Sequence, residues 1–296
     1  MPPFVGAIEA GGTKFVCAYG HSPDDLVEAR IPTTTPAETL DRVAQWFLDC
    51  GVPLGALGIG AFGPVELDPA SPKWGWITST PKPGWRDTDL AGELRRRLGV
   101  PVGFETDVNA AALGERRWGA GAGCRDFIYV TVGTGIGGGV IAGGALVHGL
   151  LHPELGHIRL PHDRDRDPFP GLCPYHGDCL EGLASGPAMQ ARWGQPAEML
   201  PPDHPAWTLQ AEYLALAIGN WICCFSPRRV ILGGGVMQGG GEALLAAIRR
   251  RVPALLAGYL DCAAIRRDID GYIVPPGLGS RSGILGALAL AEAAGG

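Results

Sequence analysis

Three short segments of this chain place glycines directly after a run of apolar, strand-forming residues: 9–14, 133–139 and 233–235. Glycine has no Cβ atom, so a ligand can approach the backbone closely, and the N–H groups of such a turn can converge on phosphate oxygens. One turn of this kind is more typical of a tight hairpin than of a binding site. Three in one chain favour a nucleotide-binding protein.

The residues of these turns are the candidate nucleotide contacts. Thr13 and Thr134 add hydroxyl donors, and Lys14 either adds a cation or points to solvent. The full candidate set is Gly11, Gly12, Thr13, Lys14, Gly133, Thr134, Gly135, Gly233, Gly234 and Gly235. A dinucleotide fingerprint is not expected, because the pattern after Gly139 indicates a strand rather than a helix, and the chain has no Walker A sequence.

The first two turns each lie between two apolar segments, which indicates a β-hairpin in both places. The repeated hairpin predicts two related halves, and 296 residues suffice for two domains. Residues 66–86 form a long loop rich in Pro, Trp and Gly. Its tryptophans Trp74, Trp76 and Trp85 favour an ordered loop that lines a site.

Charge and composition exclude several classes of partner. The net charge is -6, and the densest basic patch, Arg95–Arg97, is typical of a solvated helix face, so no nucleic acid partner is expected. The chain shows no signal-peptide pattern and no apolar stretch of about 18 residues, which predicts a cytoplasmic protein without a membrane partner. Its eight cysteines are then expected to be thiols or metal ligands.

Four residues form a candidate metal site. Cys173, His176 and Cys179 follow one another at three-residue spacing in one loop, and His157 supplies a fourth ligand from upstream. Two thiolates and two imidazoles suit tetrahedral zinc, and four protein ligands imply a closed, structural site. The alternative is a polar loop with incidental residues, but cytosolic cysteines rarely cluster in this way.

Asp107 follows a strand and begins a helical pattern. Taken alone, it is best explained as an acid at a helix N-terminus, where the helix dipole favours negative charge. Beside phosphate-binding turns, it also suits a base that accepts the proton of an attacking hydroxyl group during phosphoryl transfer. Asn109 lies in the same helix, where it either contacts the substrate or only caps and packs.

Three segments resemble the ROK family (repressors, open reading frames and kinases): residues 9–14, 107–115 and 132–139. The resemblance covers essentially the whole chain and implies a sugar kinase of the actin-like ATPase-domain superfamily. Residues 31–35, 78–85 and 173–192 resemble the bacterial fructokinase branch in particular. Residues 78–85 are the feature that favours fructose.

The resemblance implies an α/β, two-domain, actin-like ATPase (ribonuclease H-like) fold with the active-site cleft between domains. Residues 1–107 and the C-terminal helix 283–296 are expected in the small domain, and residues 108–282 in the large domain with the zinc-binding loop. The implied reaction is ATP-dependent phosphorylation of D-fructose to fructose 6-phosphate. ATP phosphates would bind the first two turns with Mg²⁺, the third turn would lie near adenosine, and the protein would be a homodimer.

The resemblance also assigns roles to residues. It places the catalytic base at Asp107 and sugar contacts at Glu154, His157 and Glu181, and zinc would hold the loop that carries Glu181 against the segment that carries Glu154. The chain departs from the common family pattern at His176, where Cys is usual, and at Glu9, where Asp is usual. The segment 279–283 lacks the acidic residue often found there.

Other functions stay open from the sequence. No physical argument from the residues distinguishes fructose from the substrates of a glucokinase, a mannokinase or an amino-sugar kinase. A sugar-sensing, non-catalytic regulator is the alternative of another class. Its DNA-binding form needs a helix-turn-helix ahead of the first glycine turn, which begins here at Gly11. A sugar-binding pseudokinase is disfavoured by Asp107 and by the intact turns.

Overall fold

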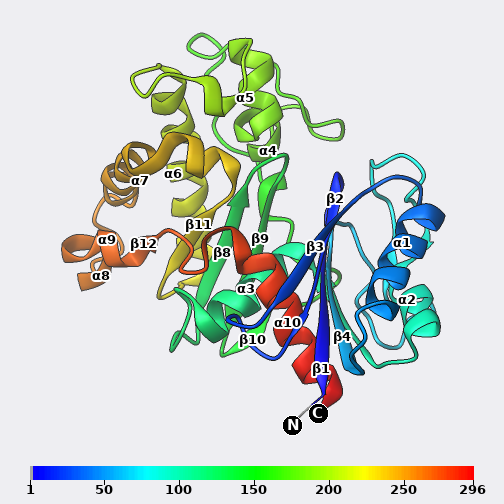
Figure 1. The fold of residues 1–296 in the computed structure, drawn as a ribbon. Coiled ribbons are helices and arrows are strands. Elements are labelled where there is room, and N and C mark those ends of the chain that lie inside the picture. The colour runs from blue at the N-terminus through cyan, green and yellow to red at the C-terminus, as the bar shows by residue number, and fades with distance from the viewer. Residues whose placement is uncertain (1–2) are drawn as a thin grey trace. The chain divides into compact units, whose positions relative to one another are not determined.

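The computed structural model describes residues 3–296 and divides into two compact units (Figure 1). Among the described residues, unit 1 comprises 3–122, 148–152 and 281–296, and unit 2 comprises 123–147 and 153–280. The expected boundary at residue 107 differs from this division, because residues 108–122 belong to unit 1. Their helix packs on the C-terminal helix, which belongs to unit 1 as well.

Unit 1 is built on a five-stranded sheet in the order β3-β2-β1-β4-β7. β1 pairs antiparallel with β2 and parallel with β4, so the sheet joins a hairpin to parallel strands. The strands are β1 (Phe4–Ala10), β2 (Lys14–Gly20), β3 (Val27–Pro32), β4 (Leu54–Ala61) and β7 (Val102–Thr106). A separate two-stranded sheet contains β5 (Trp76–Ile77) and β6 (Thr88–Asp89).

Helices cover both faces of this sheet, as Figure 1 shows. α1 (Pro36–Leu48) and α2 (Leu90–Leu98) bury their apolar faces with β1 and β4 in one hydrophobic core. α3 (Asp107–Trp118) and α10 (Ser282–Gly295) pack together on the other face. There the sheet presents Gly58, where a Cβ atom would lie 1.8 Å from the carbonyl oxygen of Ala287, so only glycine admits α10 so closely.

Trp85 belongs to the core of unit 1. Its side chain is fully buried, its ring lies 5.4 Å from that of Phe15, and its Nε1–H donates to the carbonyl oxygen of Thr34. The expectation that Trp85 lines a site is therefore wrong for this residue. Its large apolar surface is more stable in the core than in the loop's solvent-facing part.

Unit 2 repeats the strand order of unit 1. Its sheet has the order β10-β9-β8-β11-β12, again an antiparallel hairpin followed by parallel strands. The strands are β8 (Phe127–Val132), β9 (Ile136–Ala142), β10 (Ala145–Leu146), β11 (Val230–Gly233) and β12 (Ile273–Val274). The prediction of two related halves, each opening with a glycine-turn hairpin, is confirmed.

The helices of unit 2 enclose a second hydrophobic core. They are α4 (Leu180–Ala184), α5 (Gly186–Trp193), α6 (Ala206–Phe225), α7 (Gly235–Leu255), α8 (Ala263–Arg267) and α9 (Ile269–Tyr272). Short 3₁₀ turns are η1 (Leu155–His157), η2 (Ala197–Met199) and η3 (Gly279–Arg281). Within residues 3–296, none of the helices combines the length and apolar character needed to cross a bilayer.

Candidate active site and metal centre

The first glycine turn joins β1 to β2 and is closed by backbone hydrogen bonds. The N–H of Gly11 donates to the carbonyl oxygen of Lys14, and the Thr33 hydroxyl donates to the carbonyl oxygen of Gly11. Thr13 and Lys14 are exposed at the turn. The turn therefore presents a hydroxyl group and an ammonium group beside backbone N–H groups, as an anion site requires.

Glu9 precedes this turn on β1, and its carboxylate lies against the start of α10. A Cβ atom on Gly283 would come within 2.5 Å of that carboxylate. Burial raises the pKa of Glu9 above its ordinary value, and Lys14 partly opposes the increase.

Asp107 is the first residue of α3, at the end of β7. Thr106 caps the helix, because its side chain accepts a hydrogen bond from the N–H of Asn109. The Oδ1 atom of Asp107 accepts one from the N–H of Val108 at 2.8 Å, and the residue is partly exposed. Helix-terminal N–H groups stabilise the ionised form of such a carboxylate.

Asn109 is buried, and its position depends on a residue that the sequence analysis did not single out. Its Nδ2 atom donates to Oε2 of Glu105 at 2.8 Å, and the other Glu105 oxygen lies 2.7 Å from Nε2 of His148. Glu105 is buried on β7, two residues before Asp107. An acid four residues before Asn109 was visible in the sequence, but its contact with His148 depends on the tertiary fold.

The second and third glycine turns lie beside each other in unit 2. Gly234 has φ of 97°, and a Cβ atom there would lie 2.4 Å from the carbonyl oxygen of Val132, so glycine is required where the turn after β11 meets the end of β8. The carbonyl oxygen of Gly133 accepts the N–H of Gly186 at the start of α5. Thr134 is exposed at the second turn.

A pocket of about 280 Å³ opens beside the third turn. Most of its lining is apolar or glycine, and its polar side chains are those of Gln238 and Glu242. The lining residues are Leu232, Gly233, Gly234, Met237, Gln238, Gly241, Glu242, Leu245, Pro275, Pro276 and Gly279. Such a pocket suits a flat aromatic ring with a few hydrogen-bonding edges.

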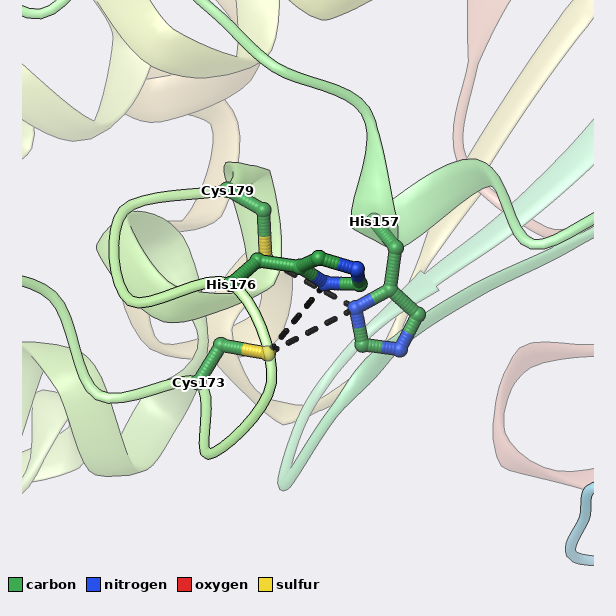
Figure 2. Close-up of side chains that lie close together, drawn as sticks. All are labelled: His157, Cys173, His176 and Cys179. Atoms are coloured by element: carbon green, nitrogen blue, oxygen red, sulfur yellow. Dashed lines mark hydrogen bonds between the residues drawn. The ribbon is translucent and has the colours of Figure 1, made fainter.

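The structure brings together the four predicted metal ligands. Figure 2 shows His157, from η1, facing the loop that carries Cys173, His176 and Cys179. One ligand atom from each residue lies within 4.8 Å of the others. The loop closes on itself through reciprocal backbone hydrogen bonds between Cys173 and Gly177. Cys179 pairs with Arg159 in a β-bridge, which fixes the loop next to η1.

The spacing of these atoms fits tetrahedral zinc. Zn–S bonds of about 2.3 Å and Zn–N bonds of about 2.0–2.1 Å place neighbouring S and N ligands about 3.6 Å apart. The Nδ1 atom of His157 lies 3.7 Å from Sγ of Cys173 and 3.6 Å from Sγ of Cys179, and Nδ1 of His176 lies 3.6 Å from Sγ of Cys173. Burial raises the pKa of the Cys179 thiol to about 11, so its thiolate needs a cation for stability near neutral pH.

Glu181 lies directly beside this centre, in the first turn of α4. Its Oε1 atom is 3.9 Å from Nε2 of His157, the ring nitrogen that faces away from the cysteines. Its Oε2 atom accepts the N–H of Ile136 at 2.9 Å, so the carboxylate is bound to the second glycine turn. No sequence pattern indicates this link between Glu181 and the turn, since 45 positions separate Glu181 from Ile136.

Glu154 precedes η1 and therefore stands close in the chain to His157, one of the four candidate metal ligands. Partial desolvation raises its pKa, His157 lowers it, and the nearby Glu181 carboxylate raises it. Glu154, His157 and Glu181 are thus electrostatically coupled, and unit 2 brings together the three residues predicted to bind sugar.

Comparison with known proteins decides the family. The model of the ROK family matches residues 5–294. The chain belongs to the ROK family. This ROK protein is 46% identical over 291 residues to a fructokinase from Pediococcus pentosaceus, with 98% of each chain covered. It is also 46% identical over 299 residues to a fructokinase from Zymomonas mobilis, covering 98% of this chain and 96% of the relative.

A solved structure supports the same family assignment. The ROK family glucokinase from Streptomyces griseus, in complex with glucose and AMPPNP, matches with a TM-score of 0.75 and 27% identity over 98% of this chain and 99% of that one. The predicted fold class is confirmed, since this ROK protein has the α/β, actin-like two-domain fold of its structural neighbours.

Proposed function

We propose that this protein is a fructokinase, which transfers the γ-phosphoryl group of ATP to D-fructose and releases fructose 6-phosphate. The observation that carries the proposal is the 46% identity to two fructokinases across nearly the whole chain, against 27% to the glucokinase. The glycine turns and the acidic groups described above are the residue types that phosphoryl transfer to a sugar hydroxyl requires.

Asp107 is the general base in this proposal. Its carboxylate accepts the proton of the attacking sugar hydroxyl as the new O–P bond forms and the bond from the γ-phosphorus to the β–γ bridging oxygen breaks, which releases ADP. The N–H of Val108 donates to this carboxylate at the N-terminus of α3. Glu105 and Asn109 hold the start of α3, and Asn109, two residues after the base in the same helix, is the further proposed sugar contact.

Glu154, His157 and Glu181 are the proposed sugar contacts. Two carboxylates and an imidazole offer several acceptors and a donor to the hydroxyl groups of a hexose. His157 uses its Nε2 atom, because its Nδ1 atom faces the cysteines.

ATP enters as its Mg²⁺ complex, and the metal neutralises charge on the phosphates. The turns at Gly11–Lys14 and Gly133–Gly135 supply N–H groups, hydroxyl groups and the Lys14 ammonium to the phosphates. Gly233–Gly235 and the adjoining apolar pocket receive the adenosine, whose ring needs a flat apolar site with a few polar edges.

His157, Cys173, His176 and Cys179 hold a structural zinc ion in this proposal. Four protein ligands leave no position for a substrate, so the ion contributes rigidity and takes no part in the transfer. Zinc joins η1, next to Glu154, to the loop that leads into α4 with Glu181. The protein is further proposed to be a cytoplasmic homodimer, which light scattering of the purified protein would test.

The decisive test is ATP consumption by purified protein with Mg²⁺ and one sugar at a time. Fructose, glucose, mannose and N-acetylmannosamine should be supplied at equal concentrations, with a no-sugar control for background hydrolysis. Strong turnover on fructose, with the product identified as fructose 6-phosphate by NMR, is the expected result. Preference for another sugar would reject fructose and keep the kinase, whereas sugar binding without any turnover would favour a non-catalytic regulator.

A further inference from the structure

α4, the helix that carries Glu181, is only five residues long. Helices of that length have no independent stability in water, because nucleation costs more than so few hydrogen bonds return. The position of Glu181 is therefore set by what α4 contacts at its two ends. Its N-terminal end follows Cys179 of the metal centre directly, and the N–H of Leu180 donates to the carbonyl oxygen of Ile158.

The carbonyl groups at the other end of α4 are bound by groups from three different segments. Such groups lack partners within a helix and need them elsewhere when they are buried. The carbonyl oxygen of Gly182 accepts the N–H of Leu172 at 2.9 Å. That of Leu183 accepts Nη1 of Arg192 at 2.8 Å, and that of Ala184 accepts Nε2 of Gln210 at 2.7 Å.

The Arg192 guanidinium is held in one orientation. Nε and Nη2 each lie 3.1 Å from a different carboxylate oxygen of Asp167, and the guanidinium carbon Cζ lies 4.4 Å from the centre of the Phe169 ring. The Tyr213 hydroxyl donates to Asp167 at 2.6 Å. Arg192 and Asp167 are only 8% and 4% exposed.

A buried ion pair gains little stability compared with apolar residues of the same size, because removing both charges from water is costly. This pair instead fixes the orientation of the Arg192 guanidinium group. With Nε and Nη2 bound to Asp167, Nη1 is the guanidinium nitrogen aimed at α4. Gln210 is also buried, and its amide donates to the adjacent carbonyl group.

We propose that Arg192, oriented by Asp167, and Gln210 are positioning residues that fix the C-terminal end of α4 and thereby set the place of the Glu181 carboxylate. The inference rests on the proposed function, in which Glu181 contacts the sugar. Neither residue touches the substrate. The metal centre holds one end of the short helix, these two side chains hold the other, and the affinity for fructose depends on both.

Two variants test this proposal in the zinc-loaded, full-length protein. Arg192→Lys keeps the charge beside Asp167, but an ammonium group cannot bind both Asp167 oxygens and the Leu183 carbonyl group in the same geometry. Gln210→Met keeps the length of the side chain and removes only the donor. Arg125→Lys is the matched control, since Arg125 also donates to a backbone carbonyl group in unit 2, at Gly143, far from α4 in sequence and exposed.

Arg192→Lys and Gln210→Met should each raise the KM for fructose about tenfold, as expected for the loss of one hydrogen bond of this kind, and leave the KM for ATP within about twofold. The amide of Ile136, which donates to Glu181, should exchange with deuterium about tenfold faster. Zinc content should stay at that of the parent protein. In a Glu181→Ala background, Arg192→Lys should have no further effect on the KM for fructose, because it acts through Glu181.

An unchanged KM for fructose and unchanged Ile136 exchange in both folded, zinc-loaded variants would overturn the proposal. So would a rise in the KM for fructose on adding Arg192→Lys to Glu181→Ala that equals the rise caused by Arg192→Lys alone. If Arg192→Lys does not fold, Gln210→Met decides the question alone. If the parent protein does not phosphorylate fructose, or Glu181→Ala leaves its KM unchanged, the proposed function or the sugar role of Glu181 fails. Exchange at Ile136 needs no substrate and still tests the positioning of Glu181.

Discussion

Replacing Gly135 by alanine should weaken fructose binding through the side chain of Glu181. A Cβ atom at position 135 would lie 2.7 Å from Oε2 of Glu181, whereas ordinary contacts begin at 3.4 Å. The carboxylate therefore has to move by at least about 0.7 Å. A shift of that size breaks or badly distorts its hydrogen bond from the N–H of Ile136.

The size of the effect follows from that hydrogen bond. Hydrogen bonds to a charged group contribute about 1.5–3 kcal/mol, and every 1.4 kcal/mol is about tenfold in affinity. Gly135→Ala should thus weaken fructose binding about tenfold or more. The backbone should persist, because the clash involves the end of a flexible side chain. Calorimetric titration with fructose in the absence of nucleotide isolates this effect from any change at the phosphate turn.

Two comparisons make the result decisive. Gly219→Ala is the control, because a Cβ atom in that α6 position meets nothing within 4 Å, and it should leave fructose binding unchanged. In a Glu181→Ala background the clashing atom is gone, so Gly135→Ala should add no further loss. Fructose affinity equal to that of the parent protein in a folded Gly135→Ala variant would refute the reasoning.

Three further predictions concern the base, the metal and a buried acid. Asp107→Asn should lower kcat by about 10²–10⁴ without changing the thermal unfolding midpoint much, and near-normal turnover would exclude Asp107 as the base. Cys179→Ser should lose the zinc found in the parent protein by elemental analysis, and full occupancy would remove Cys179 from the ligand set. Glu9→Gln should raise the unfolding temperature at pH 8. Burial raises the pKa of Glu9 in the folded state, so at pH values above 4.5, its ordinary pKa, the ionised carboxylate destabilises the fold. The increase in unfolding temperature should disappear at pH values below 4.5, and a constant difference between the variant and the parent protein across the pH range would contradict this prediction.

The local features of this protein were predictable from its sequence. The hairpins with glycine turns follow from apolar runs interrupted by glycine, a pattern that depends on neighbours in the chain. The metal centre was predictable for the same reason, because three of its four ligands lie within seven residues, and the fourth approaches them as expected. The family resemblance added the fold class, which the comparisons confirm.

Residues that act through distant partners were not predictable. Trp85 appeared to belong to a site-lining loop, yet the most favourable place for its ring is the core beside Phe15 and Phe62. Residues 108–118 were expected in the large domain, but the small residues of α3 let this helix pack closely on α10 in unit 1.

The sequence by itself determined the kinds of chemical group available: the glycine turns, the candidate base and the candidate metal ligands. Local spacing suffices for these, since the backbone between close neighbours has few conformations. Only the tertiary structure decided which groups meet. The Glu181 carboxylate binds the N–H of Ile136, and Arg192 reaches the end of α4 while paired with Asp167. Such contacts depend on how buried side chains fill a shared core and satisfy one another's hydrogen bonds, which no spacing along the chain specifies.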